Sequence, residues 1–391
     1  MKRDWEYGTF ADIMKPAKSE RCGDRTDLPV LSITMHQGII FQNERFKKVI
    51  ASKDTKDYKI IKEGQLVIAF PIDEGLIYTQ DIVKEGIMSP AYNVWDVDYS
   101  KLNKKFLNLY FHSPWAMSYY KSKLRGTTLR RRMIPKEDLL ALPIPIPTIA
   151  EQEKIIAELD CLSLIIDKKK QQIEEYDNLA QSIFFEMFGN PAENDKGWDR
   201  KCIDGIFTFI KNGANIKQTK GASGIPITRI ETLSGGIFNR DRLGYADIFS
   251  TEKYASNILD DGDLLFSHIN SKTHIGRTVV YFKKDCETII HGMNLLRMKV
   301  DFTIAHPIYI NYFFKTNYFK DKIASYRKDA VNQSSISIGD LKKIIVNIPP
   351  IALQQEFAAK IAAIEKQKEL IKKSIKEVEN LLNSRMDYYF N

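Results

Sequence analysis

One long segment of the chain occurs twice, and this repeat constrains the fold more than any other feature. Residues 146–189 align with residues 348–391 at a constant offset of 202 positions, without a gap. Thirteen of the 44 aligned positions are identical, and in the first copy they are Ile146, Pro147, Ile149, Ala150, Gln152, Ala157, Lys170, Ile173, Glu175, Asn178, Leu179, Ser182 and Phe188. A repeat of this length indicates two copies of one structural unit, related by an internal pseudo-two-fold.

Each copy is predicted to form one long helix, because it runs for almost forty residues without Gly or Pro. Apolar residues recur at alternating spacings of four and three, which is typical of a coiled-coil seam. In the first copy they are Ile155, Leu159, Leu162, Ile166, Ile173, Tyr176, Ala180, Ile183 and Met187. In the second copy they are Phe357, Ile361, Ile364, Ile371, Ile375, Val378 and Leu382. Lys169 and Lys368 interrupt the stripe. We expect the copies to pair as an antiparallel coiled coil, and two unrelated surface helices are the alternative.

The positive charge of the chain lies between these helices. Residues 1–145 carry 24 Lys and Arg against 18 Asp and Glu, and residues 191–347 carry 23 against 17, so both segments have a net charge of +6. Residues 146–190 have a net charge of −5 and residues 348–391 of +1. The composition therefore divides the chain into globule, helix, globule and helix at these boundaries. Two equally basic globules favour a polyanion contacted twice, although ordinary surfaces also carry such charge.

The two globules are distant copies of each other. With an offset of 198, residues 60–67 match residues 258–265, and Tyr- and Phe-rich helical segments follow at 102–123 and 307–326. Gly-containing turns and apolar runs predict strands at 29–33, 65–70, 225–230, 263–266 and 278–282. The predicted fold class is α+β: two similar α/β globules, each with a mainly antiparallel sheet, alternate with the two long helices.

The sequence lacks the motifs of common catalytic sites. It has no GxxxxGKS or GxxxxGKT phosphate loop, no Gly-rich cofactor loop and no HExxH zinc motif. His268 and His274 could form a metal pair, but loop histidines that face DNA or solvent are more common. The four cysteines are far apart, which favours a reducing cytoplasm. We therefore expect a cytoplasmic protein that is not an enzyme and holds no metal or cofactor.

Basic and polar side chains gather just before each helix. Arg and Lys neutralise phosphates, Ser and Thr fix the register on the backbone, and Asn, Gln and Arg read base edges. The candidate DNA-binding residues of the first half are Lys121, Lys123, Arg125, Thr127, Thr128, Arg130, Arg131 and Arg132. Those of the second half are Lys320, Lys322, Arg327, Lys328, Asn332, Gln333 and Ser334. Loops after predicted strands add Thr34, His36, Gln37, Arg229, Thr232, His268, Asn270 and Lys272. A solvated basic helix end is the alternative for either cluster.

This arrangement resembles the specificity subunit of type I restriction-modification systems over essentially the whole chain. The resemblance rests on the helix entries at 146–153 and 348–356 and on residues 332–337, which lead through Asp340 and Leu341 into the second helix. It implies that the globules are target recognition domains, each of which reads one half of a split sequence in double-stranded DNA. It also implies that the helices dock two methyltransferase subunits that hold S-adenosylmethionine, while separate restriction subunits use ATP and magnesium.

Two other functions remain open from the residues alone. A coiled-coil scaffold could use its basic globules to bind nucleic acid without sequence preference, or to bind a membrane surface. An enzyme such as a nuclease could carry a site that has no recognisable motif. Selective binding of one DNA sequence would distinguish the specificity subunit from the scaffold, and metal-dependent cleavage by the chain alone would favour the nuclease.

Overall fold

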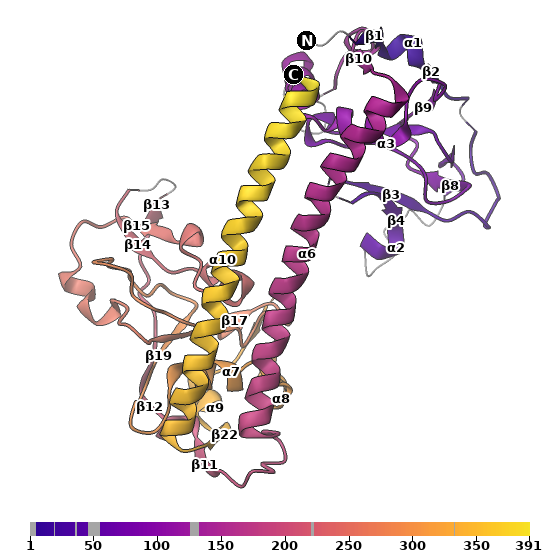
Figure 1. Cartoon of the computed structure of the whole chain (residues 1–391). Coiled ribbons are helices and arrows are strands. Elements are labelled where there is room, and N and C mark those ends of the chain that lie inside the picture. Colours follow the sequence, from indigo (N-terminus) through magenta and orange to yellow (C-terminus); the bar gives the residue numbers. More distant parts are fainter. Residues whose placement is uncertain are drawn as a thin grey trace. The chain divides into compact units, whose positions relative to one another are not determined.

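The repeated segment forms two helices of 40 residues each, α6 (Ile149–Phe188) and α10 (Ile351–Phe390) (Figure 1). They are described from a computed structural model that covers residues 5–18, 20–35, 37–45, 55–125, 133–219, 223–331 and 333–391. Both helices begin slightly later than predicted, because the residues before them are strands, β10 (Pro143–Ile146) and β22 (Ile345–Ile348). Proline follows each strand, and proline is well suited to a helix entry.

The chain divides into two units, and each unit takes one part of both helices. Unit 1 comprises Met1–Gln171 and Lys372–Asn391, and unit 2 comprises Gln172–Ile371. Each unit therefore combines one globule with the first part of one helix and the last part of the other. The division into four segments, residues 1–145, 146–190, 191–347 and 348–391, remains a prediction from the sequence.

Unit 1 contains a four-stranded antiparallel sheet of order β2-β9-β6-β7 and three two-stranded pairs, β1-β10, β3-β4 and β5-β8. The strands besides β10 are β1 (Glu6–Thr9), β2 (Met14–Pro16), β3 (Leu31–Thr34), β4 (Gly38–Phe41), β5 (Lys59–Lys62), β6 (Leu66–Ile68), β7 (Ile77–Thr79), β8 (Glu85–Met88) and β9 (Asn93–Val97). The shorter helices are α1 (Phe10–Ile13), α2 (Gln42–Arg45), η1 (Ile72–Glu74), α3 (Lys104–Phe111), α4 (Pro114–Lys123) and α5 (Lys136–Leu140).

Unit 2 contains a four-stranded antiparallel sheet of order β12-β19-β16-β18, the pair β11-β22, and two three-stranded sheets, β13-β15-β14 and β17-β21-β20. Its strands besides β22 are β11 (Asp199–Cys202), β12 (Phe207–Asn212), β13 (Gln218–Thr219), β14 (Ile225–Ile227), β15 (Gly244–Ala246), β16 (Leu264–Phe266), β17 (Ile269–Asn270), β18 (Thr278–Val280), β19 (Leu296–Val300), β20 (Lys328–Asp329) and β21 (Ser334–Ser335). Its shorter helices are η3 (Ile203–Gly205), η4 (Ile230–Gly236), η5 (Arg240–Arg242), η6 (Glu252–Asn257), α7 (Pro307–Phe313), α8 (Asn317–Tyr326) and α9 (Ile338–Lys342).

The four-stranded sheets have the same strand order in both units, which confirms that the globules share one α+β frame. Several details differ from the sequence-based expectation. The helical segments at 102–123 and 307–326 are each two helices, because Ser113 and Thr316 cap a new helix start. The strand expected at 225–230 ends at Ile227, and a 3-10 helix begins at Ile230.

The cores of the two units are completed by equivalent aromatic residues of the repeat. In unit 1, Phe390 of α10 is 5% exposed, and its ring lies 5.5 Å from Phe106 and 5.7 Å from Tyr110. In unit 2, the equivalent Phe188 of α6 is buried, with its ring 4.7 Å from Tyr309. The last turn of each long helix is therefore part of the core of one unit.

A buried glutamine at the start of each long helix explains a second identity of the repeat. Gln152 accepts a hydrogen bond from the backbone N–H of Asn103 (2.7 Å) and donates to the carbonyl groups of Lys101 and Pro147 (2.8 and 2.9 Å). In unit 2, Gln354 accepts from the N–H of His306 (2.9 Å). It also donates to the carbonyls of Ile304 and Pro349 (3.2 and 2.8 Å). Since both amides are fully buried, Gln152 holds the start of α6 to the loop that precedes α3, and Gln354 holds the start of α10 to the loop that precedes α7.

Within each unit the two long helices contact each other with opposite chain directions. In unit 1, Arg385 forms an ion pair with Glu158, and a second nitrogen of Arg385 donates to that carboxylate at 3.0 Å. In unit 2, Lys368 is 5% exposed and contacts Asp177 at 2.6 Å and Glu365 at 2.9 Å. Burial disfavours the charged form of Lys368, but these two hydrogen bonds raise its pKa above the ordinary value. Lys368, which interrupts the predicted seam in the second copy, is therefore an ion-paired member of it.

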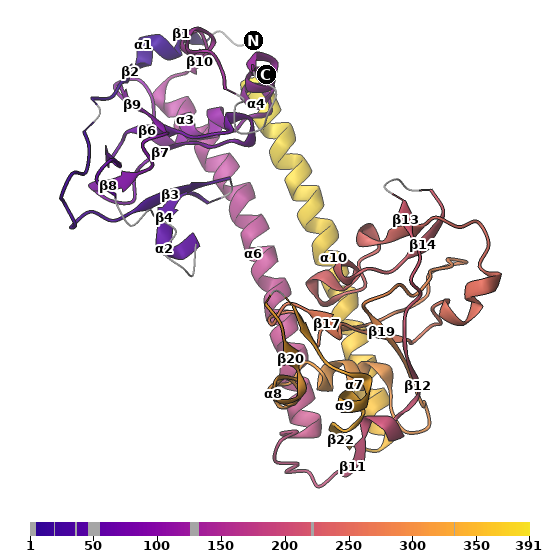
Figure 2. The same cartoon turned by 180° about the vertical axis from the view of Figure 1, so that it is seen from behind.

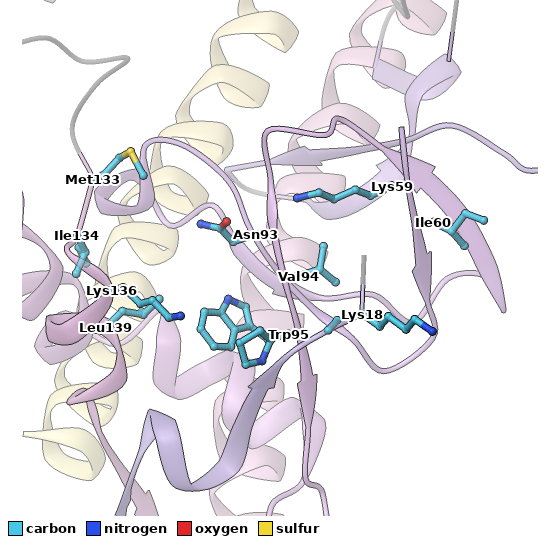
Figure 3. A pocket seen from close by; sticks show the side chains of 12 residues that line it. Lys18, Lys59, Ile60, Asn93, Val94, Trp95, Met133, Ile134, Lys136 and Leu139 are labelled. Atoms are coloured by element: carbon cyan, nitrogen blue, oxygen red, sulfur yellow. The ribbon is translucent and has the colours of Figure 1, made fainter. Parts of the chain in front are cut away.

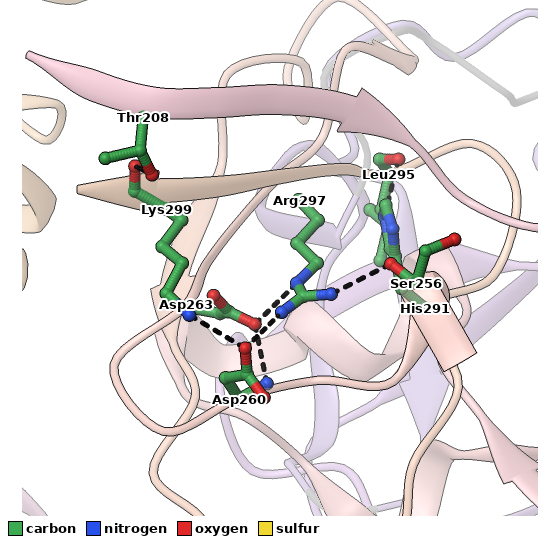
Figure 4. Close-up of polar contacts among 8 residues, drawn as sticks. All are labelled: Thr208, Ser256, Asp260, Asp263, His291, Leu295, Arg297 and Lys299. Atoms are coloured by element: carbon green, nitrogen blue, oxygen red, sulfur yellow. Dashed lines mark hydrogen bonds and ion pairs between the residues drawn. The ribbon is translucent and has the colours of Figure 1, made fainter. Parts of the chain in front are cut away.

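A second buried ion pair fixes the central strands of unit 2 (Figure 4). The guanidinium of Arg297 on β19 donates to Asp263 at 2.6 Å and to Asp260 at 2.9 Å, and Lys299 contacts Asp260 at 2.8 Å. Burial raises the pKa of Asp263, whereas the hydrogen bond from Lys299 lowers the pKa of Asp260. The cluster joins the turn before β16 to β19. Among the described residues, no helix is long and apolar enough to cross a membrane.

Candidate nucleic-acid interface

A basic concavity of unit 2 is lined by residues of α8 and of the loop between β17 and β18. Figure 2 labels α8 and β17 in this unit. The volume of the concavity is about 490 Å³. Among the described residues, five cationic side chains and no carboxylate line it: Lys272, Arg277, Lys315, Lys320 and Arg327. We call it the cationic cavity. A wall that contains cations and no acids suits a phosphate group.

The cations of this cavity differ in how far they are neutralised. Asp329 contacts Lys272 at 2.9 Å and Arg327 at 3.1 Å, and the pKa of Asp329 is lowered, first by a hydrogen bond from Ser334. Within the described ranges, neither Arg277 nor Lys320 has a carboxylate within 4.0 Å. Their charge is thus available to an external anion.

Lys315 contributes a more buried charge to the same cavity. Its ammonium lies 4.5 Å from the centre of the Tyr312 ring, and burial lowers the pKa of Lys315. An anion that entered the cavity would favour the charged form of this lysine and would gain from the reduced screening.

A second, smaller concavity of about 260 Å³ adjoins the first, and Arg277 lines both. Its other lining residues include hydrogen-bonding side chains from three segments: Glu231, Ser234, Arg242, Ser267, Asn270 and His274. We call it the polar groove. Amide, guanidinium and carboxylate groups are the side chains that distinguish base edges in the major groove.

Glycine shapes the border between the two concavities. Gly235 and Gly236 have φ angles of 71° and 72°, a conformation that residues with a side chain rarely adopt. Both residues line the cationic cavity, whereas the preceding Ser234 lines the polar groove. The pair therefore lets the chain turn away without a side chain that would obstruct either concavity.

The structure brings several of the predicted DNA-binding residues of unit 2 together. Lys272, Lys320 and Arg327 line the cationic cavity, and Asn270 lines the polar groove. Lys322, Lys328 and Gln333 are exposed outside these walls. Arg229 is exposed and donates a hydrogen bond to the side chain of Gln218. Their contacts with DNA stay predictions.

Three other predicted residues of unit 2 are buried, and two of them hold local structure through hydrogen bonds. Thr232 accepts a hydrogen bond from the N–H of Arg229 at 2.8 Å, and Ser334 donates to Asp329 at 2.6 Å. His268 is 7% exposed, and burial lowers its pKa to about 4, so its ring is neutral near pH 7. These side chains are placed to support the surface, and a direct contact with DNA would require them to move.

In unit 1, the predicted residues lie on two separate elements. Lys121 is exposed on α4, while Lys123 and Arg125 pair with Asp138 at 2.9 and 3.6 Å. Thr34 donates to the carbonyl of Gly38 at 3.1 Å in the β3-β4 turn, where Gln37 is exposed. The remaining candidates lie outside the described residues: His36, Thr127, Thr128, Arg130, Arg131, Arg132 and Asn332.

Unit 1 has a concavity of about 390 Å³, which is lined by Met133 among other residues (Figure 3). In Figure 3, Lys59 and Lys136 extend toward the space beside Asn93 and Trp95. Lys59 donates to the carbonyl of Tyr92 at 2.6 Å, and burial lowers its pKa. In the part of the chain that the structure describes, no carboxylate lines this concavity either, so both units present a cationic concavity.

Sequence reasoning missed Arg242, Arg277 and Lys315, which all line the two concavities of unit 2. Arg242 and Lys315 belong to no basic cluster in the sequence, and Arg277 precedes a strand. The Gly235-Gly236 pair was a local signal for this region of the surface, since a pair of glycines marks a turn. Among the described residues, no three His, Cys, Asp or Glu side chains gather so as to hold a metal ion.

The chain is similar to type I restriction enzyme specificity subunits. One relative is the putative MjaX specificity subunit of Methanocaldococcus jannaschii, to which the chain is 38% identical over 194 residues. The aligned segment covers 47% of this chain and 45% of that protein. Another relative is the EcoKI specificity subunit of Escherichia coli, to which the chain is 25% identical over 245 residues. That alignment covers 59% of this chain and 52% of the relative. The chain thus matches about half the length of these two relatives.

The fold is similar to that of a chain in a solved structure, which was reported as the structural basis of complex assembly and conformational transition of the type I R-M system. The TM-score is 0.58 at 17% identity, over 99% of this chain and 97% of that one. The family model described as the type I restriction modification DNA specificity domain matches residues 2–175 and again residues 195–380. The chain therefore belongs to the family of the type I restriction modification DNA specificity domain and carries two copies of that domain.

Proposed function

We propose that this chain selects the DNA sequence on which a type I restriction-modification complex acts, with each unit reading one half of a split target. The observation that carries the proposal is a duplicated frame with different polar surfaces. The strand order of the main sheet and the buried glutamine recur in both units. The residues that line the concavities differ between the units: Lys272, Arg277 and Lys320 line the cationic cavity of unit 2, whereas Lys59, Asn93 and Lys136 line the concavity of unit 1.

The long helices have a surface that suits two copies of one partner. Glu175, Asn178, Leu179 and Ser182 of α6 are exposed, and the identical residues 202 positions later on α10 are exposed as well. Spacings of three, four and seven place these four residues on one face of a helix. Since burial within the chain does not account for four identical exposed positions, we assign this repeated face to the docking of two methyltransferase subunits.

The chemistry of the complex would then reside on its partners. S-adenosylmethionine would bind to the methyltransferase subunits, and ATP with magnesium to separate restriction subunits, while this chain contributes recognition and no catalysis. The relatives named as specificity subunits favour this division of labour. The alternative of a scaffold that binds nucleic acid without sequence preference gains no support from them.

Selection from a random library of double-stranded DNA tests the proposal. The chain is co-expressed with a methyltransferase subunit of a type I system, bound to the library at several salt concentrations and recovered with its DNA. We expect a motif of two short halves separated by a fixed gap, with an affinity that falls steeply as salt rises. Equal recovery of all sequences would contradict sequence recognition and would favour the scaffold.

A further inference from the structure

Asn270 has the hydrogen-bonding groups of an adenine reader, and two serines hold them in place. One amide hydrogen donates to the hydroxyl oxygen of Ser267 at 3.0 Å. The amide oxygen accepts the backbone N–H of Ser271 at 2.8 Å. A primary amide has two N–H donors and two oxygen lone pairs, so one donor and one acceptor of Asn270 remain unused by the described residues.

The remaining pair matches one base edge in the major groove. Adenine presents an N6 amino donor and an N7 acceptor, and asparagine contacts both with its oxygen and its amide nitrogen. The contact with Ser271 also fixes which end of the amide is oxygen, because a backbone N–H can only donate. The orientation of the amide is therefore set before any DNA arrives.

The backbone at Asn270 is held as firmly as its side chain. Asn270 belongs to β17 and pairs in antiparallel register with Ser334 of β21, while Ile269 pairs with Ser335. The hydroxyl of Ser334 is bound to Asp329, which also holds Lys272 at the wall of the cationic cavity. One small sheet thus connects the amide to a cation that suits a phosphate, so that base and backbone contacts share one register.

Asn270 can be reached from the polar groove. The residue is partly exposed and lines the polar groove, with Arg242 and Arg277 on the same groove. Thr232 and His268, also predicted from the sequence, are buried and lack this access. We propose that Asn270 is the residue that specifies an adenine in the half-site read by unit 2; this inference rests on the proposed function.

The test compares Asn270→Ala and Asn270→Asp with the unchanged chain in the complete complex, using the random double-stranded library. For Asn270→Ala we expect the preference for adenine to fall roughly tenfold to a hundredfold at one position of one half-site. All other positions should keep their preference, and the salt dependence should not change because no charge is removed. Asn270→Asp keeps the acceptor for Ser271 but has no donor, so at that position it should favour cytosine, whose N4 group is a donor.

Two controls separate a reading role from a structural one. Lys272→Ala should weaken binding about equally on all sequences, since it removes a cation and no base contact. Ser267→Ala removes one of the two contacts that hold the amide and should reduce the adenine preference at the same position by a smaller factor.

The outcomes distinguish this inference from the proposed function. If the unchanged complex selects no motif, the proposed function fails and the inference fails with it. If it selects a split motif and Asn270→Ala keeps every preference, or loses preference at several positions together, the assignment of Asn270 is overturned while the function stands.

Discussion

The dependence of unit 1 on α10 can be tested by removing the ring of Phe390. This side chain is 5% exposed and packs on Phe106 and Tyr110, which lie in the core of unit 1. Truncation of a buried phenylalanine to alanine costs about 3–5 kcal/mol, because transfer energy is lost and a cavity remains. At about 1.4 kcal/mol per tenfold, Phe390→Ala should raise the opened fraction of unit 1 by roughly a hundredfold to several thousandfold.

Hydrogen exchange measured by mass spectrometry resolves this effect by unit. Amides of α3 should lose protection in Phe390→Ala, and amides of α7 should keep it. The matched variant Phe188→Ala should show the reverse pattern, because Phe188 packs on Tyr309 in unit 2. Asp387→Ala, which changes an exposed residue of the same helix, should alter stability by less than about 0.5 kcal/mol. Equal loss of protection in both units would refute the reasoning that each helix end serves one core.

Other consequences follow from the helices and loops. Leu179→Asp should remove one methyltransferase subunit from the complex without unfolding the chain, and the double variant with Leu381→Asp should remove both, as counted by native mass spectrometry; full occupancy would exclude the repeated face. Gln354→Ala should destabilise unit 2 by about 2–3 kcal/mol in denaturant melts, because a buried N–H loses its acceptor, and an unchanged midpoint would show that the clamp is dispensable. Arg131→Ala should weaken binding on all sequences and reduce the log–log salt slope by about 1; a loss confined to the target sequence would identify a base reader. Arg240 lowers the pKa of Glu287 to about 2 from an ordinary 4.5. The unchanged chain should therefore have a larger free energy of unfolding than Glu287→Gln above about pH 5, and this difference should disappear as the pH falls toward 2. A difference that does not vary with pH would contradict this.

The long helices could be predicted because their signal is local and periodic. Two continuous 40-residue helices follow from apolar spacing and from the absence of Gly and Pro. The same spacing placed Ile183 and Met187 on the seam, whereas the structure buries Phe184 and Phe188 more deeply. Those aromatic residues contact the globule as well as the other helix, and a periodicity argument considers only the helix.

The identity of Gln152 in the repeat could be found but not explained from the sequence. Its partners are backbone groups about fifty positions away, at Lys101 and Asn103. No motif links a glutamine to a distant backbone group, because any exposed backbone N–H or carbonyl can serve. The structural reason for that identity needed the tertiary fold.

The candidate surface was predicted in its parts but not in its assembly. Asn270, Lys272 and Lys320 were selected for their residue types, and their convergence depends on strand pairing that local sequence does not encode. Thr232 and Ser334 were selected for the same reason, but their hydroxyl groups hold turns and are buried. Ser and Thr serve both roles equally well, so composition does not separate them.

The central claim is that the two units read independent halves of one DNA target. It is tested most directly by replacing residues 191–347 with the equivalent globule of another member of the family and sequencing the methylated positions in cells that express the complex. The account predicts that one half of the methylated motif changes while the other half is retained. A change in both halves, or in neither, would contradict it.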